Sequence, residues 1–93
     1  MLLRDAVGKE LRAARVAQSR TLRDVARDAR VSLGYLSEVE RGQKEASSEL
    51  LASICTALNI QLSTLLSDVT SHIAKSEKTA LRVINSEINS DAA

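Results

Sequence analysis

The chain has 93 residues, a formal net charge of +1, three glycines and no proline, and its abundant helix-forming residues predict one small all-α domain. Its single cysteine, Cys55, excludes an intramolecular disulfide and a multi-cysteine metal site, and no cofactor is expected. The apolar runs are too short to span a bilayer and no signal-peptide pattern opens the chain, so we expect a cytoplasmic protein.

The two halves of the chain differ in charge. Residues 1–45 carry ten Lys and Arg against seven Asp and Glu, whereas residues 46–93 carry three against five. A nucleic acid would bind to the more basic half. The first predicted helix lies there, over about residues 3–18, and its apolar residues recur at helical spacing. They should form its inner face: Leu3, Val7, Leu11 and Ala14.

Two short helices separated by a tight break are predicted between residues 21 and 42. Thr21 and Asp24 form a capping-box-like start for a helix over about residues 22–29. Ser32 is a good N-cap for a helix over about residues 33–41, and Gly42 can adopt the left-handed conformation that ends it. Two helices joined in this way form the helix-turn-helix pattern, whose second helix can enter the DNA major groove.

Two more helices and a C-terminal segment follow. The fourth helix should begin near Ser47 or Ser48 and the fifth near Gln61 or Leu62, which completes a five-helix domain over residues 1–69. Residues 70–93 have the spacing of a further amphipathic helix. The polar stretch around Ser76 would allow a break in it, and a flexible tail is expected from Asn89.

Six residues of the second motif helix and its end form a recurring pattern: Ser32, Tyr35, Ser37, Glu40, Arg41 and Gly42. They resemble the signature of Cro/CI-type (XRE) helix-turn-helix regulators. The longer run VSLGYLSEVERGQKEASSELL resembles the subgroup that controls Clp protease genes, the ClgR type. The resemblance extends from about Val7 to Leu66. It implies a lambda-repressor-like domain with an additional C-terminal helical segment, and binding of double-stranded DNA.

By this resemblance, four residues of the second motif helix face DNA base edges: Leu33, Gly34, Ser37 and Glu38. Leu33 can contact a thymine methyl group, and Glu38 can accept a hydrogen bond from cytosine N4. The set lacks a bidentate Arg or Gln, so part of the specificity should come from DNA shape. The alternative is that Leu33 and Glu38 are ordinary surface residues.

Basic residues around the motif are candidate ligands for DNA phosphates. These basic residues are Arg23, Arg27, Arg30, Arg41 and Lys44, and Tyr35 is a further candidate for contact with the DNA backbone. The alternative for each arginine is a solvated charged surface. Leu22 departs from the family, because many members have there a Gln that braces the second motif helix, and that contact is not carried over.

Arg15 and Glu40 resemble an ion pair that joins the first helix to the third in the family. Glu40 follows Leu36 by four residues, so its carboxylate should point inward and need a cationic partner. We therefore interpret Glu40 as a structural residue rather than a residue that reads bases.

One helix-turn-helix reads only a few base pairs, so a homodimer on a palindromic operator is expected. The candidate dimer interface is apolar: Leu66, Val69, Ile73, Leu81, Ile84 and Ile88. The alternative is that these residues pack on their own domain. The final residues Ala92 and Ala93 resemble tags recognised by Clp-type proteases. This tail makes a Clp protease a candidate partner, and RNA polymerase is a further candidate partner of a transcriptional regulator.

The sequence thus predicts a homodimeric transcriptional regulator, and the subgroup favours an activator of Clp protease and related stress genes. Catalysis is not expected, because His72 has no plausible catalytic partner and Cys55 should be a small buried hydrophobe. No small-molecule ligand domain and no membrane partner are expected. The rival hypothesis is that the fold serves as a protein-interaction module or an antitoxin-like partner.

Overall fold

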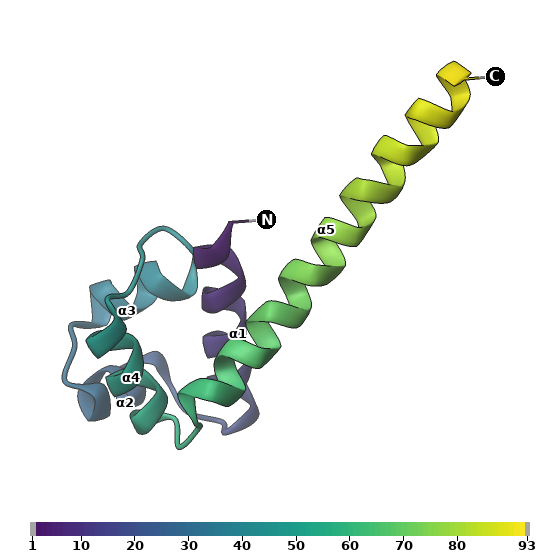
Figure 1. Cartoon of the computed structure of the whole chain (residues 1–93). Helices are drawn as coiled ribbons and strands as arrows, with labels where there is room; N and C mark the ends of the chain where they lie inside the picture. Colours follow the sequence, from purple (N-terminus) through teal and green to yellow (C-terminus); the bar gives the residue numbers. More distant parts are fainter. Residues whose placement is uncertain (1, 93) are drawn as a thin grey trace.

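Five α-helices make up the computed structural model, which describes the backbone of residues 2–92 and the side chains of residues 2–82. They are α1 (Leu3–Ala17), α2 (Leu22–Ala29), α3 (Leu33–Glu40), α4 (Ser48–Ala57) and α5 (Leu62–Ala92). The described backbone contains no strand, which confirms the predicted all-α class. Helices α1 to α4 and the start of α5 form one body, and the rest of α5 projects from it (Figure 1).

The core is aliphatic and draws side chains from all five helices. Its members are Ala6, Leu11, Val25, Ala26, Ala29, Leu36, Val39, Ile54, Cys55, Leu58, Leu65 and Val69. Each large aliphatic side chain that is fully covered contributes about 1.5–3 kcal/mol to folding. Cys55 is only 2% exposed, which confirms the prediction that it is a small buried hydrophobe, and burial raises the pKa of its thiol. Tyr35 packs only partly against this core.

Helix α1 approaches the end of α3 more closely than its apolar pattern indicates. Gly8 is buried, and a Cβ atom at this position would lie 2.5 Å from the Glu40 carbonyl oxygen and 2.6 Å from that of Val39. The absence of a side chain at Gly8 therefore permits the contact. Leu3 was predicted to face inward, but it is 61% exposed, because the covered inner face of α1 begins only at Ala6, which is fully buried.

Side-chain caps define the starts of the short helices as predicted. The Thr21 hydroxyl oxygen accepts from the Asp24 amide at 3.0 Å, and the Thr21 amide donates to the Asp24 carboxylate at 3.1 Å. The Ser32 hydroxyl oxygen accepts from the Tyr35 amide at 3.0 Å. Gly42, at φ +73°, provides the predicted left-handed residue just after α3. These caps satisfy backbone groups that the helix ends leave without partners.

Helix α5 is continuous past Ser76, where the polar stretch would allow a break, so the fifth helix and the C-terminal amphipathic segment form one element. No glycine or proline follows Gly42, and the hydroxyls of Thr70 and Thr79 donate to carbonyls four residues earlier, which keeps the polar stretch compatible with a helix. The helix passes Asn89, where the sequence predicts the start of a flexible tail, and ends at Ala92. Ala93 lies outside the described residues.

The first half of α5 packs against α1. Val69 is 2% exposed and belongs to the core of its own chain, where α5 lies against α1, so its assignment to a dimer surface is wrong. His72 Nε2 lies 2.5 Å from a carboxylate oxygen of Glu10 on α1. Within residues 2–82, no single helix is both long and apolar enough to cross a membrane; α4 and the start of α5 meet that test only as a pair bent by 106°.

Candidate nucleic-acid interface

The outward side of α3 carries the four residues predicted to face DNA bases. Leu36 and Val39 turn into the core, at 0% and 1% exposure, and this leaves positions 33, 34, 37 and 38 on the outward side of the helix. Leu33 is 40% exposed, and a Cβ atom at Gly34 would meet nothing within 4 Å. Ser37 and Glu38 are half-buried. The structure therefore brings the four positions together on an accessible surface.

Tyr35 and Lys44, both predicted to contact the DNA backbone, lie next to each other. The Lys44 ammonium nitrogen is 5.6 Å from the centre of the Tyr35 ring, a cation–π distance. Tyr35 is half-buried and Lys44 is exposed. This contact links the loop after α3 to α3 itself, so the two residues can approach a phosphate from the same side.

The predicted phosphate ligands differ in whether a carboxylate already neutralises them. Arg23, Arg30, Arg41 and Lys44 are exposed and form no ion pair with any residue between 2 and 82. Arg27 instead lies 3.8 Å from a carboxylate oxygen of Asp24 and 3.4 Å from one of Asp28. Exposed pairs of this kind are worth only about 0–1 kcal/mol, so Arg27 could exchange them for a phosphate at small cost.

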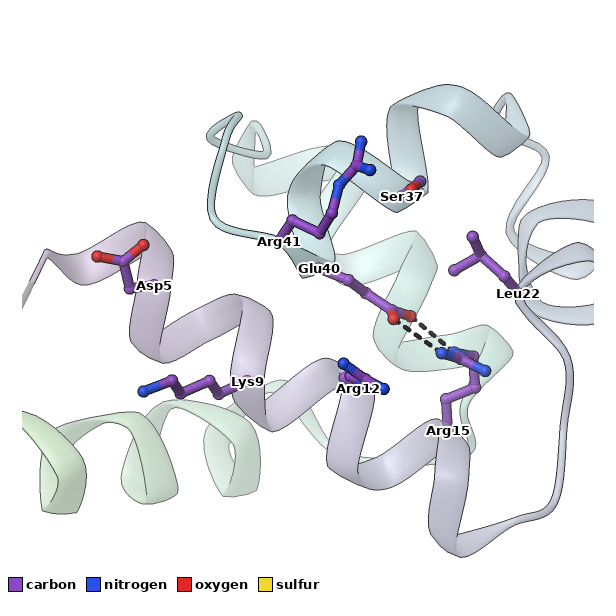
Figure 2. A pocket seen from close by; sticks show the side chains of 8 residues that line it. All are labelled: Asp5, Lys9, Arg12, Arg15, Leu22, Ser37, Glu40 and Arg41. Atoms are coloured by element: carbon purple, nitrogen blue, oxygen red, sulfur yellow. Dashed lines mark hydrogen bonds and ion pairs between the residues drawn. The ribbon is translucent and has the colours of Figure 1, made fainter.

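Arg15 and Glu40 form the ion pair that the sequence predicts. Arg15 Nε donates to Glu40 Oε2 at 2.8 Å and Arg15 Nη2 donates to Glu40 Oε1 at 3.0 Å, a bidentate arrangement (Figure 2). The third guanidinium nitrogen donates to the Arg20 carbonyl at 3.0 Å. The side chains are only 16% and 7% exposed, and the hydrogen bond to Glu40 raises the pKa of Arg15. The pair ties α1 to the last residue of α3 and thereby orients the helix.

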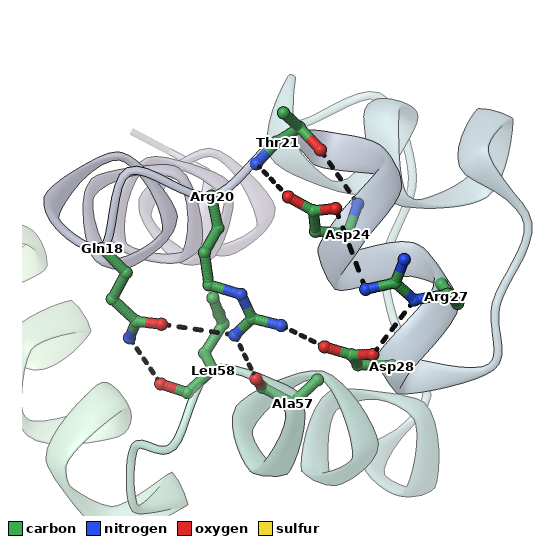
Figure 3. Close-up of polar contacts among 8 residues, drawn as sticks. All are labelled: Gln18, Arg20, Thr21, Asp24, Arg27, Asp28, Ala57 and Leu58. Carbon is green, nitrogen blue, oxygen red and sulfur yellow. Dashed lines mark hydrogen bonds and ion pairs between the residues drawn. The ribbon is translucent and has the colours of Figure 1, made fainter.

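A second polar cluster, which the sequence reading missed, holds α4 to the link between α1 and α2. Arg20 donates to the Ala57 carbonyl and pairs with Asp28, while Gln18 donates to the Leu58 carbonyl at 2.5 Å (Figure 3). The end of α4 contains no basic residue of its own. The last carbonyls of a helix need hydrogen-bond donors. The absence of a basic residue from the last turn of α4 was therefore the feature of the sequence that could have indicated a donor from elsewhere in the chain.

Comparisons with known proteins agree with this geometry. The helix-turn-helix family model matches residues 11–65, which include all of α2, α3 and α4. The chain is also 58% identical over 79 residues to the transcriptional regulator ClgR of Mycobacterium tuberculosis (strain H37Rv), covering 85% of this chain and 70% of that protein. The chain belongs to the XRE helix-turn-helix family, as a ClgR-type member. It is therefore a DNA-binding regulator of transcription.

Solved structures support the ClgR-type assignment. The clp gene regulator ClgR from Corynebacterium glutamicum superimposes with a TM-score of 0.79 at 45% identity, covering 90% of this chain and 92% of that one. The restriction-modification controller protein C.AhdI from Aeromonas hydrophila superimposes with a TM-score of 0.65 at 29% identity, covering 67% and 94% of the two chains. The fold is thus shared by a clp gene regulator and a restriction-modification controller protein.

Proposed function

We propose that this ClgR-type regulator binds a palindromic operator as a homodimer and activates Clp protease and related stress genes. The observation that carries the proposal is the 58% identity to the Mycobacterium tuberculosis ClgR, which extends over 79 residues and so beyond the helix-turn-helix region. The Corynebacterium glutamicum relative is itself described as a clp gene regulator. Activation, rather than repression, rests on the resemblance to this group.

In the proposed complex, the outward side of α3 enters the major groove. Leu33 contacts a thymine methyl group, Ser37 donates or accepts at a base edge, and Glu38 accepts from cytosine N4. The exposed position of Leu33 and the open space at Gly34 support close approach of the helix to the base edges. Without a bidentate base contact, DNA shape supplies the remaining discrimination.

The exposed cations around α3 hold the complex in register. Arg23, Arg30, Arg41 and Lys44 can bind phosphates without first losing an ion pair to residues 2–82. Arg27 contributes after exchanging its exposed carboxylate partners. Each phosphate contact releases condensed counterions, so the affinity for DNA falls as the salt concentration rises.

Homodimerisation rests on the exposed apolar residues of α5. Leu66 is 43% exposed and Leu81 is 57% exposed, and the projecting part of α5 supports a contact with a second copy. Ile73 is half-buried against its own core and contributes less, while the side chains of Ile84 and Ile88 lie outside the described residues. A twofold dimer places two copies of α3 about 34–36 Å apart, one turn of DNA.

The proposed partners after DNA binding are RNA polymerase, as required of an activator, and a Clp protease that degrades the regulator through Ala92 and Ala93. Ala93 lies outside the described residues, and Ala92 is the last residue of α5. Degradation of the regulator by the protease whose genes it activates would form a feedback loop. Replacing both alanines by Asp should lengthen the half-life of the protein in cells, and an unchanged half-life would contradict this partner.

Genome-wide binding of the purified chain to fragmented DNA tests the proposal. The wild type should enrich a shared palindromic site beside Clp protease genes, and the variant Tyr35→Ala/Arg41→Ala should lose that enrichment. Lys78→Ala, an exposed charge change on α5, is the matched control and should retain it. No enrichment from a folded wild-type dimer would favour the rival function, a protein-interaction module.

A further inference from the structure

A basic hollow lies between α1 and α3, beside the surface proposed to read DNA. Its volume is about 530 Å³, and α1, the start of α2 and the end of α3 line it (Figure 2). The Arg15–Glu40 ion pair lines part of the wall, where the two charges neutralise each other. The character of the hollow is therefore decided by the other charged residues that line it.

Three of these residues are cationic and one is anionic. Lys9 and Arg12 come from α1 and Arg41 from the end of α3, and all three are exposed without an ion pair to residues 2–82. The anion, Asp5, lies against Gly42. The excess of positive charge suits an anion, and Lys9 and Arg12 are three residues apart on one face of α1.

The hollow is continuous with the α3 surface that is proposed to face DNA. Ser37 and Arg41, assigned above to a base edge and to a phosphate, both line it. Leu22 forms the α2 side of the wall and has no hydrogen-bonding side chain. Four cationic side chains line the hollow, and Arg15 is already paired with Glu40. The other three, Lys9, Arg12 and Arg41, can donate to an anion without breaking that pair.

We propose that this hollow is a further phosphate-binding site, in which Lys9 and Arg12 of α1 hold a DNA backbone phosphate next to the groove that α3 enters. The inference rests on the proposed docking of α3 and extends the DNA contact surface to α1. Arg41 contacts the same stretch of backbone from α3. The contact is independent of base sequence, so it strengthens binding and fixes register without changing which bases are preferred.

The size of the effect follows from counterion release. Neutralising one phosphate changes the slope of log K against log salt by about 0.9, so loss of one such contact weakens binding about eightfold at ~0.1 M salt and very little near ~1 M. A dimer that binds two half-sites loses about twice that slope. The variant Lys9→Gln/Arg12→Gln should show this change on a short random-sequence duplex.

The matched control is Lys75→Gln/Lys78→Gln, which removes the same charge from exposed positions of α5. It should leave both the slope and the affinity at ~0.1 M salt close to those of the wild type. A change of equal size in the control, or an unchanged slope in a folded Lys9→Gln/Arg12→Gln variant, would overturn the inference. Absence of DNA binding by the wild type at low salt would instead contradict the docking of α3.

A free anion is the other source of phosphate chemistry. Inorganic pyrophosphate, titrated into the protein without DNA and followed by NMR, distinguishes it. If pyrophosphate shifts the signals of Lys9 and Arg12 while the double variant binds DNA like the wild type, the hollow holds a small anion and the DNA assignment is wrong. If the variant loses DNA affinity and slope as calculated, the phosphate is that of the DNA backbone.

Discussion

Removing one partner of the Arg15–Glu40 pair should destabilise the whole fold. Breaking a buried ion pair by deleting one member costs about 3–5 kcal/mol. Because the Arg15 and Glu40 side chains retain 16% and 7% exposure, solvent reduces this figure, and we expect about 2–3 kcal/mol for Arg15→Met. For a domain of this size, that loss lowers the melting temperature by about 10–20 °C.

Urea and thermal unfolding of a double-mutant cycle would measure the interaction. Arg15→Met leaves the covered Glu40 carboxylate without its guanidinium, whereas adding Glu40→Met removes the buried charge as well. The double variant should therefore be more stable than the sum of the single losses indicates, by at least about 1 kcal/mol. Arg12→Met, an exposed neighbour on α1, is the control and should change stability by less than about 0.5 kcal/mol.

The reasoning would be refuted if Arg15→Met were as stable as Arg12→Met. It would also be refuted if the effects of the two single changes added without coupling, because the bidentate geometry would then carry no energy of its own. A loss of DNA affinity in Arg15→Met at full stability would instead assign the guanidinium to a phosphate.

Three further perturbations test individual contacts. Gly8→Ala places a methyl group 2.5 Å from the Glu40 carbonyl and should cost about 1–3 kcal/mol in urea unfolding, while Gly34→Ala, with open space, should cost nothing. The backbone amide of Thr21 and then its side chain lower the pKa of Asp24; Thr21→Ala removes only the side-chain contribution, so an NMR titration should show that pKa rising part of the way. A folded-state pKa below the unfolded value of about 3.9 contributes stability above that value, and this stability is lost as the pH falls through the folded-state pKa. The variant should therefore lose less stability than the wild type over this pH range. Thiol reagents should modify Cys55 only as fast as the protein unfolds, and prompt reaction of the native protein would contradict its burial.

The helix-turn-helix was predictable because its determinants are local. Thr21 and Asp24 cap α2 within one turn, Ser32 caps α3, and Gly42 ends it, so each signal lies within four residues of the structure it specifies. The family pattern added the long-range pair of Arg15 and Glu40. The helical spacing alone indicates that Glu40 faces inward, but it does not identify Arg15 as the partner.

The errors concern packing between segments distant in the chain. Gly8 reads as a weak point in a helix, and its role emerges only when the end of α3 lies against it. The apolar spacing that includes Val69 fits either a dimer surface or a core, and its burial in the core of its own chain decides for the core. Arg20 looks like one more candidate surface arginine until the carbonyls at the end of α4 come within reach.

The central claim is that the outward side of α3 reads base sequence, and the variant Glu38→Gln tests it most directly. Glu accepts from cytosine N4, whereas Gln pairs in bidentate fashion with adenine N6 and N7. Selection from a random-sequence duplex library should therefore show the preference at one position of each half-site changing from cytosine to adenine, with the other positions retained. A preference identical to that of the wild type, from a folded variant that still binds DNA, would contradict the proposed orientation of α3 in the groove.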